Sequence, residues 1–202
     1  MPTMSRVEAA FCRSAPWGLF TRRVVLPRAL AGIRPSGEVL EVGAGSGAMA
    51  DALLAAYPDI TLTATDYDEA MVDAIRWRLD RHGSRAKAER ADATALHYPD
   101  STFDTVLTFI MLHHTIHWER ALSEAVRVLR PGGQLVGYDL LAARPLRLLH
   151  RIERAPHRLL DLNDLRDVLD QLPVSDTSIR PGLGSHLVRF AARRTDGRRT
   201  EA

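Results

Sequence analysis

The stretch from Val39 to Gly47, VLEVGAGSG, joins an apolar run to three glycines at two-residue spacing. Glycines at the end of a strand allow a tight turn and let a ligand approach bare backbone. A helix that begins after such a turn adds backbone N–H groups and the positive end of its dipole. The stretch therefore predicts a loop that binds a nucleotide or nucleoside, and with Ala48 it fits the relaxed dinucleotide pattern G-x-G-x-x-A.

Acidic residues around this loop distinguish between possible ligands. Glu41 lies two residues before the first glycine, where an anion repels a pyrophosphate but attracts an ammonium or sulfonium group. Asp66 ends the next predicted strand, a position suited to ribose hydroxyls. Asp92 ends the strand after that and can accept a hydrogen bond from the exocyclic amine of adenine. These acids describe a cationic nucleoside better than a dianionic dinucleotide.

A second group of reactive side chains follows two further predicted strands. His113 and His114 lie in MLHHTIHWE, and Tyr138 and Asp139 lie in GYDLL. A histidine with a pKa near neutrality can take a proton from a phenol or hydroxyl. The candidates for a general base are therefore His113, His114 and Asp139, and a purely structural role for these residues is the competing interpretation.

The elements that must position these residues alternate between strands and helices from about residue 37 to residue 140, a pattern typical of βαβ units around a parallel sheet. Strands are expected at 37–42, 60–65, 86–91, 103–110 and 134–138, and helices at 46–57, 68–82 and 118–129. Residues 144–171 form a helical, arginine-rich stretch, and β-like runs near 174–180 and 186–192 flank a turn signal that predicts a hairpin.

The length of 202 residues fits one domain. We expect a helical cover over 1–36, the main domain over 37–192 and a disordered tail over 193–202. The chain is 46% hydrophobic and 26% charged, and no apolar run approaches the ~20 residues that cross a bilayer. With no basic-then-apolar leader and a single cysteine, Cys12, a soluble protein of the reducing cytoplasm is expected. The net charge of +2 gives no reason to expect nucleic acid as a partner.

The sequence resembles the class I S-adenosylmethionine-dependent methyltransferases, in particular the small branch that includes the ubiquinone and menaquinone biosynthesis methyltransferases. The resemblance covers about residues 37–140 and rests on five features in the right order: VLEVGAGSG, TATD, RADA, FDTVLTFIMLHH and ALSEAVRVLRPGGQLV. It implies an α/β, Rossmann-like, doubly wound sheet of seven strands, mostly parallel with the last strand antiparallel. This fold agrees with the predicted hairpin.

The resemblance also implies S-adenosyl-L-methionine as the cofactor and assigns its parts. Glu41 and the glycines would meet the methionine end, Asp66 the ribose, Tyr67 the adenine face, Asp92 and the Ala93 backbone the adenine edge, and Phe109 the region near the amino acid portion. The expected cofactor-binding residues are Glu41, Gly43, Ala44, Gly45, Gly47, Asp66, Tyr67, Met71, Asp92, Ala93 and Phe109. The competing interpretation is that they only form turns and helix caps.

The acceptor is expected to be a small molecule, because so short a chain leaves little room for a recognition domain. The histidines favour an oxygen acceptor. Aromatic residues in the first 36 positions, Phe11, Trp17 and Phe20, suit an apolar or planar acceptor and equally suit simple packing. His113 and His117 have a spacing found in zinc sites, but the family pattern starts a helix near Trp118, so no metal is expected.

Two alternatives from other classes stay open: an NAD(P)-dependent oxidoreductase, and a non-catalytic nucleotide-binding or assembly protein with the same fold. A basic stripe could also touch an anionic membrane surface or an acidic substrate, although a solvated face is the simpler interpretation. Its members are Arg144, Arg147, Arg151, Arg154 and Arg158. The sequence predicts neither an oligomeric state nor the identity of the acceptor.

Overall fold

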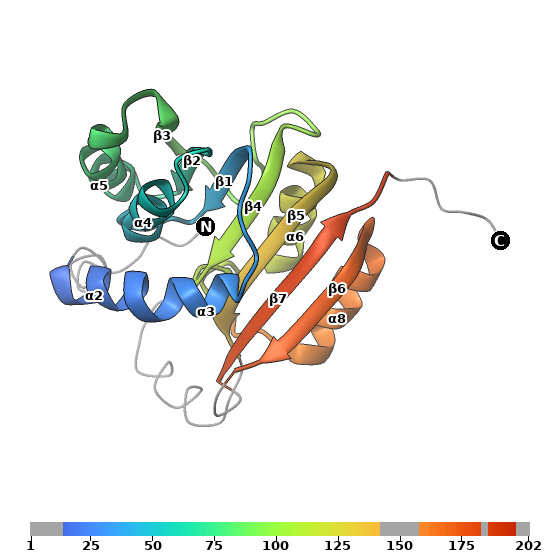
Figure 1. Ribbon diagram of the computed structural model, residues 1–202. Helices are drawn as coiled ribbons and strands as arrows, with labels where there is room; N and C mark the ends of the chain where they lie inside the picture. Colours follow the sequence, from blue (N-terminus) through green and yellow to red (C-terminus); the bar gives the residue numbers. More distant parts are fainter. Residues whose placement is uncertain (1–13, 142–157, 183–185, 197–202) are drawn as a thin grey trace.

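The computed structural model describes residues 14–141, 158–182 and 186–196. Its centre is one seven-stranded sheet in the order β3-β2-β1-β4-β5-β7-β6 (Figure 1). The strands are β1 Glu38–Val42, β2 Thr61–Asp66, β3 Ala86–Arg90, β4 Phe103–Phe109, β5 Leu129–Leu140, β6 Val174–Pro181 and β7 Leu187–Arg194. The first five strands pair in parallel, and β7 is antiparallel to both of its neighbours, β5 and β6. The predicted doubly wound sheet and the hairpin are confirmed.

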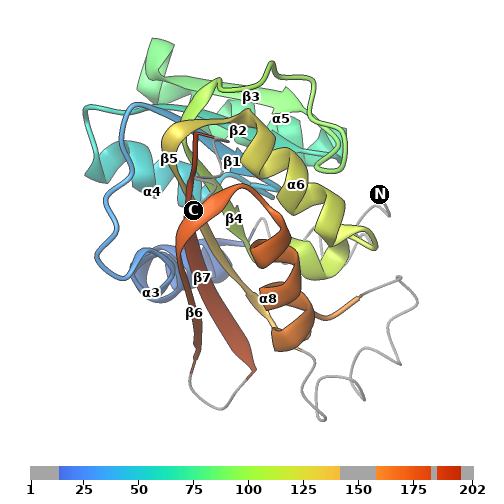
Figure 2. The same cartoon turned by 90° about the vertical axis from the view of Figure 1, so that its right-hand side faces the viewer.

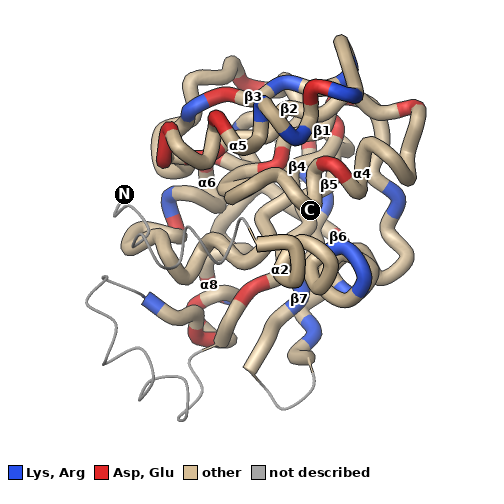
Figure 3. Tube along the Cα trace, turned by 90° about the vertical axis from the view of Figure 1, so that its left-hand side faces the viewer, with Lys and Arg blue, Asp and Glu red and all other residues tan. Residues whose placement is uncertain are grey.

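Helices cover both faces of the sheet (Figure 2). They are α2 Ala15–Phe20 and α3 Leu26–Leu30, joined by a π-helical turn at Thr21–Val25, then α4 Ala48–Ala56, α5 Glu69–Leu79, α6 Trp118–Val128 and α8 Leu162–Gln171. Apolar side chains of α3, α4 and α5 share one hydrophobic core with the sheet, and those of α6 and α8 share another on the opposite face. In Figure 3, acidic and basic residues are interspersed along the described chain.

The central strands β1 and β4 are buried along almost their whole length because helices cover both faces of the sheet, whereas the edge strands β3 and β6 are partly exposed. In β1, Val39 packs into the core beside α3, α4 and α5, whereas Leu40 packs into the core beside α6 and α8. The start of α5 is stabilised by a local hydrogen bond. The Asp68 carboxylate, at the N-cap, accepts from the Ala70 N–H at 2.9 Å. The parallel strands thus place their carboxyl ends, and the residues that follow them, along one edge.

The fifth strand begins earlier than the predicted 134–138. Leu129 already pairs with Phe103, and the register then shifts so that Thr105 pairs with Gln134. The intervening Arg130-Pro-Gly-Gly segment forms an irregularity within the strand, because proline has no N–H for the ladder and Gly132 adopts a φ of 78°. The prediction mistook this irregularity for the end of the preceding helix and a turn.

Parts of the remaining predictions lie outside the described residues. Of the arginine stripe, only Arg158 is described, and α8 occupies the last part of the predicted helical stretch. The strand β7 runs to Arg194, past the expected domain end at 192, and the proposed domain boundaries stay a prediction. Across the three described ranges, no helix has the length and apolar character that a bilayer crossing requires.

The Gly137→Ala variant tests the packing of β5 on β7. Gly137 pairs with Phe190, and a Cβ atom at Gly137 would overlap the buried Phe190 ring. We expect a loss of about 1–3 kcal/mol in the free energy of unfolding, measured by urea titration, because the buried ring must shift to admit the Cβ. Gly18→Ala is the matched control, since its nearest neighbour would be 3.8 Å away and alanine favours a helix. Equal stability of both variants would contradict this packing argument.

Candidate active site

The glycine loop connects β1 to α4 at the carboxyl edge of the sheet. Gly43 and Gly45 have φ angles of 68° and 55°, which side chains other than that of glycine rarely adopt. A Cβ at Gly43 would lie 2.7 Å from the Met111 Cβ, whereas a Cβ at Gly45 would meet no atom within 4 Å. The Ala44 N–H donates to the Thr65 carbonyl at 2.8 Å, which fixes the loop to β2. The loop is therefore packed from below at Gly43 and open at Gly45.

Glu41 lies beneath this loop in β1 and is 1% exposed. In the described part of the chain, neither carboxyl oxygen of Glu41 has a hydrogen-bond partner. Burial raises the pKa of Glu41 to about 8, and the nearby charge of Asp66 adds to this effect. A buried carboxyl without partners is costly, so a ligand that brings a cationic group would relieve it.

Asp66, at the end of β2, joins the glycine loop to the start of α5. Its Oδ2 accepts from the Gly45 N–H at 2.9 Å, and its Oδ1 accepts from the Asp68 N–H at 3.0 Å. Burial raises the pKa of Asp66, although these hydrogen bonds oppose the shift. The side chain therefore already has a structural task, and its contact with a ribose stays a prediction.

The residues expected around adenine lie beyond β2 and β3. The Arg90 guanidinium carbon is 5.3 Å from the Tyr67 ring centroid, and Arg90 Nε donates to the Tyr67 carbonyl at 3.0 Å. Asp92 Oδ1 accepts from the Thr94 N–H at 2.8 Å and from its hydroxyl at 2.7 Å. Burial would raise the pKa of Asp92, but these hydrogen bonds hold it below its usual value. Asp92 is thus a carboxylate held in a fixed orientation.

Three other expected cofactor residues are buried in the cofactor-free chain. Met71 is fully buried, and the Ala93 and Phe109 side chains are almost completely buried. Phe109 belongs to the core beside α3, α4 and α5, the same side of the sheet as Val39. Direct contacts from these side chains to a ligand stay predictions, and the Ala93 backbone assignment does not depend on its side chain.

A buried histidine–aspartate pair stands at the ends of β4 and β5. His113 Nδ1 lies 2.5 Å from Asp139 Oδ1, and the two residues are 3% and 0% exposed. Asp139 Oδ2 also accepts from the N–H groups of Met111 at 2.9 Å and Leu112 at 2.7 Å. Burial alone would raise the pKa of Asp139, but the charge and hydrogen bond of His113, with the backbone donors, hold it below its usual value.

This pattern of hydrogen bonds favours an orienting role for Asp139 over the role of general base. When His113 is neutral, an Asp139 carboxylate that accepts from Nδ1–H leaves the lone pair on Nε2, the atom that a base would use. His114 lies beside His113, with ring centroids 4.0 Å apart. The base role of His113, His114 or Asp139 stays a prediction, but the geometry separates their possible tasks.

The metal interpretation of His113 and His117 finds no support in the geometry. His113 belongs to the short 3-10 turn Leu112–His114, and His117 only caps α6, so the two are not on one helix. Within the described ranges, no group of three or more His, Cys, Asp or Glu side chains is placed to hold a metal ion.

Sequence reasoning missed two residues that shape the histidine turn. Ile110 leaves β4 with a φ of 54°, a strained conformation for a β-branched residue, and its N–H donates to the Tyr138 carbonyl at 2.7 Å. Arg158 donates its N–H to the His113 carbonyl at 3.0 Å, and its guanidinium lies 2.5 Å from Glu119. No sequence signal marks Ile110, and the arginine periodicity assigned Arg158 to a different surface.

Comparison with known proteins finds methyltransferases that are similar to this chain. Residues 39–133 match the model of a methyltransferase domain. The chain is 35% identical over 121 residues to the ubiquinone/menaquinone biosynthesis C-methyltransferase of Cupriavidus taiwanensis, covering 59% of this chain and 47% of that protein. The chain spans about half the length of the curated relatives it matches.

Solved structures share the fold at low identity. The PH0226 protein of Pyrococcus horikoshii OT3 superposes with a TM-score of 0.77 at 16% identity, covering 96% of this chain and 100% of that one. Phosphoethanolamine N-methyltransferase 2 of Haemonchus contortus, solved with phosphomonomethylethanolamine and S-adenosylhomocysteine, gives 0.73 at 13% identity, covering 89% and 53%. The matched domain and the relatives show a methyltransferase domain over residues 39–133, and the solved structures share its fold.

Proposed function

We propose that this protein transfers the methyl group of S-adenosylmethionine to a small-molecule acceptor. The observation that carries the proposal is the buried carboxyl of Glu41, which has no hydrogen-bond partner among the described residues and precedes a glycine loop that is open at Gly45. Glu41 and the loop would hold the cationic methionine end, Asp66 the ribose, and Asp92 with the Ala93 backbone the adenine edge. These groups fit a positively charged nucleoside, and a dinucleotide pyrophosphate would be repelled.

The protein's contribution to the reaction is mainly to position the two reactants. When bound, S-adenosylmethionine supplies a methyl group already activated by its sulfonium sulfur. Alignment of reactants can lower a barrier by about 7–11 kcal/mol in favourable cases. An acceptor that must lose a proton also needs a base, for which His113, oriented by Asp139, has the best-defined geometry.

A hydroxylated, planar small molecule is the acceptor class that we favour. The histidines favour methylation at oxygen, whereas the relative in Cupriavidus taiwanensis is named as a carbon methyltransferase. A phenol satisfies both, because methylation at its oxygen or at an activated ring carbon removes a proton. In the proposed cover, Trp17 and Phe20 have ring centroids 5.6 Å apart, and Phe20 is exposed, as an apolar contact surface requires.

Calorimetry with S-adenosylhomocysteine and with NAD separates the methyltransferase from an oxidoreductase. We expect the first to bind and the dinucleotide not to bind. A non-catalytic binding protein would also take the first ligand, so methyl transfer to a panel of phenols and hydroxylated aromatics must be assayed as well. The arginine stripe is outside the proposal, because Arg158 is engaged by Glu119 and His113 and its other members are not described.

The Glu41→Gln variant separates ligand binding from stability. Glutamine removes a carboxyl that is costly to ionise in its buried position. Without ligand, the variant should therefore have a free energy of unfolding about 1–3 kcal/mol higher than that of the wild type at pH 8. The same change should weaken S-adenosylmethionine binding at least about tenfold, because the charge partner of the ligand is lost. Thermal unfolding and calorimetry measure the two effects. A variant that binds the cofactor as tightly as the wild type would refute the role of Glu41.

The pH dependence of the wild type follows from the same carboxyl. The folded protein keeps a proton on Glu41 between its ordinary pKa of 4.5 and about 8, so stability contributed by this group falls as pH rises through that interval. A cationic ligand binds the ionised form, so affinity should rise toward pH 8. Calorimetry in buffers of different ionisation enthalpy should detect proton release on binding. Asp92→Asn should preserve this release, since Asp92 is already ionised, and Glu41→Gln should remove most of it.

The histidine pair is tested once a methyl acceptor is found. We expect His113→Ala to lower kcat by about 10²–10⁴-fold under saturating cofactor if it is the base. Asp139→Asn should lower kcat as well, with little effect on cofactor affinity, because one amide oxygen cannot accept both from His113 Nδ1 and from the N–H groups of Met111 and Leu112. His114→Ala serves as the comparison on the same turn. Unchanged turnover in both histidine variants would remove histidine from the mechanism.

A further inference from the structure

The segment that follows β3 carries the proposed adenine contacts without regular secondary structure. Asp92 and Ala95 form an isolated bridge, in which the Ala95 N–H donates to the Asp92 carbonyl at 3.0 Å. Thr94 engages Asp92 Oδ1, and within the described chain Oδ2 receives no hydrogen bond. The orientation of Asp92 therefore depends on how the segment from Ala93 to Asp100 is held.

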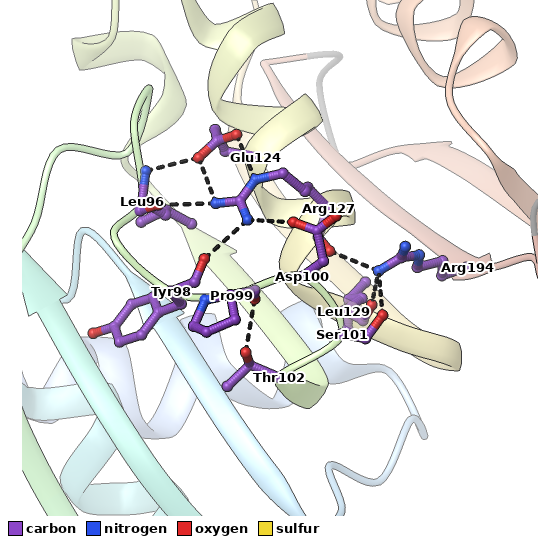
Figure 4. Close-up of polar contacts among 10 residues, drawn as sticks. All are labelled: Leu96, Tyr98, Pro99, Asp100, Ser101, Thr102, Glu124, Arg127, Leu129 and Arg194. Atoms are coloured by element: carbon purple, nitrogen blue, oxygen red, sulfur yellow. Dashed lines mark hydrogen bonds and ion pairs between the residues drawn. The ribbon is translucent and has the colours of Figure 1, made fainter.

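A carboxylate–guanidinium pair on α6 holds that segment by its backbone (Figure 4). Glu124 Oε2 accepts from the Leu96 N–H at 2.8 Å, and Arg127 donates to the Leu96 carbonyl at 2.8 Å. Another nitrogen of Arg127 donates to the Tyr98 carbonyl at 2.9 Å and to the Asp100 carboxylate at 2.7 Å. The segment is thus held by hydrogen bonds at the N–H and carbonyl of Leu96, and also at Tyr98 and Asp100.

The pair itself is held rigidly. Arg127 meets both oxygens of Glu124, with distances of 2.8 Å and 2.9 Å, in the forked geometry that only a planar guanidinium provides. The hydrogen bond with Arg127 holds the pKa of Glu124 below its usual value. Their helix is fixed on the sheet by buried apolar residues, among them Leu122 and Val126. The helix α6 thus holds Glu124 and Arg127 in one orientation, in which they bind the backbone N–H and carbonyl of Leu96.

We propose that Glu124 and Arg127 are positioning residues for the adenine end of the cofactor. They fix Leu96, next to Ala95, whose N–H bonds to Asp92, and thereby set where the Asp92 carboxylate and the Ala93 N–H point. The ligand feature that this arrangement recognises is the donor–acceptor edge of adenine, its exocyclic amine and the adjoining ring nitrogen. This inference rests on the proposed function, since it assigns the adenine end of that same site.

The selectivity between two ligands separates positioning from simple stability. S-adenosylhomocysteine carries the amine that Asp92 would accept from, whereas S-inosylhomocysteine has a carbonyl oxygen in its place. The wild type should prefer the first ligand by calorimetry. Arg127→Lys keeps the charge but loses the fork, and Glu124→Gln weakens the same fork. Each variant should reduce the preference, which is the dissociation constant of S-inosylhomocysteine divided by that of S-adenosylhomocysteine, by at least about fivefold.

Arg130→Lys is the matched control, because Arg130 also pairs with a carboxylate, that of Asp104 at 2.6 Å, but has no bond to the segment from Ala93 to Asp100. It should leave the ratio unchanged. In a double-mutant cycle, Asp92→Asn should abolish the preference, and adding Arg127→Lys should then change the ratio no further. If Arg127→Lys does not fold, Glu124→Gln alone decides the outcome.

The outcomes are distinguishable. If the variants lose both ligands by the same factor, or lose neither, the pair only supports the fold and the inference is overturned. A wild type that binds S-adenosylhomocysteine without preferring it to the inosine analogue also overturns the inference, yet leaves the proposed function standing. Binding of neither ligand by the wild type would overturn both.

Discussion

The main physical constraint on this site is the buried carboxyl of Glu41, near the carboxyl end of β1. It has no hydrogen-bond partner in the described part of the chain. The free energy needed to strip a carboxylate of water is several kcal/mol in a real protein, and no hydrogen bond in the described chain offsets it. The folded chain accommodates this by keeping the carboxyl protonated, with its pKa near 8. Ionisation of such a residue destabilises the folded protein, which agrees with its proposed role as the partner of a cationic ligand.

The surrounding structure agrees with this role. The glycine loop begins two residues after Glu41; it is packed against Met111 at Gly43, whereas a Cβ at Gly45 would meet no atom within 4 Å. Asp66 holds the loop tip by the Gly45 N–H and the start of α5 by Asp68. Each contact uses a group at the carboxyl end of a parallel strand, which is where an open α/β sheet leaves room for ligands.

The sequence predicted the sheet and the acids because both depend on local patterns. The amino-acid sequence contains the apolar runs of the buried strands and the glycines between a strand and a helix. It also contains the acids Glu41, Asp66 and Asp92 at predicted strand ends. The irregularity at the start of β5 was missed, since Pro131 and Gly132 also end helices. The strain at Ile110 and the bonds of Arg158 to His113 depend on long-range contacts that periodicity does not encode.

Two buried carboxyls, Glu41 and Asp139, show how the same chemical group acquires different tasks at one sheet edge. Asp139 accepts from His113 and from three backbone N–H groups, so burial does not keep it protonated and it stays an anion. In the described part of the chain Glu41 accepts from none, and its pKa of about 8 keeps it mostly protonated at pH 7. A group saturated with donors can orient a histidine but has no reason to exchange its proton, whereas an unsaturated one responds to ligand charge. The two environments therefore agree with the proposed roles, which are binding of a cationic ligand for Glu41 and orientation of His113 for Asp139.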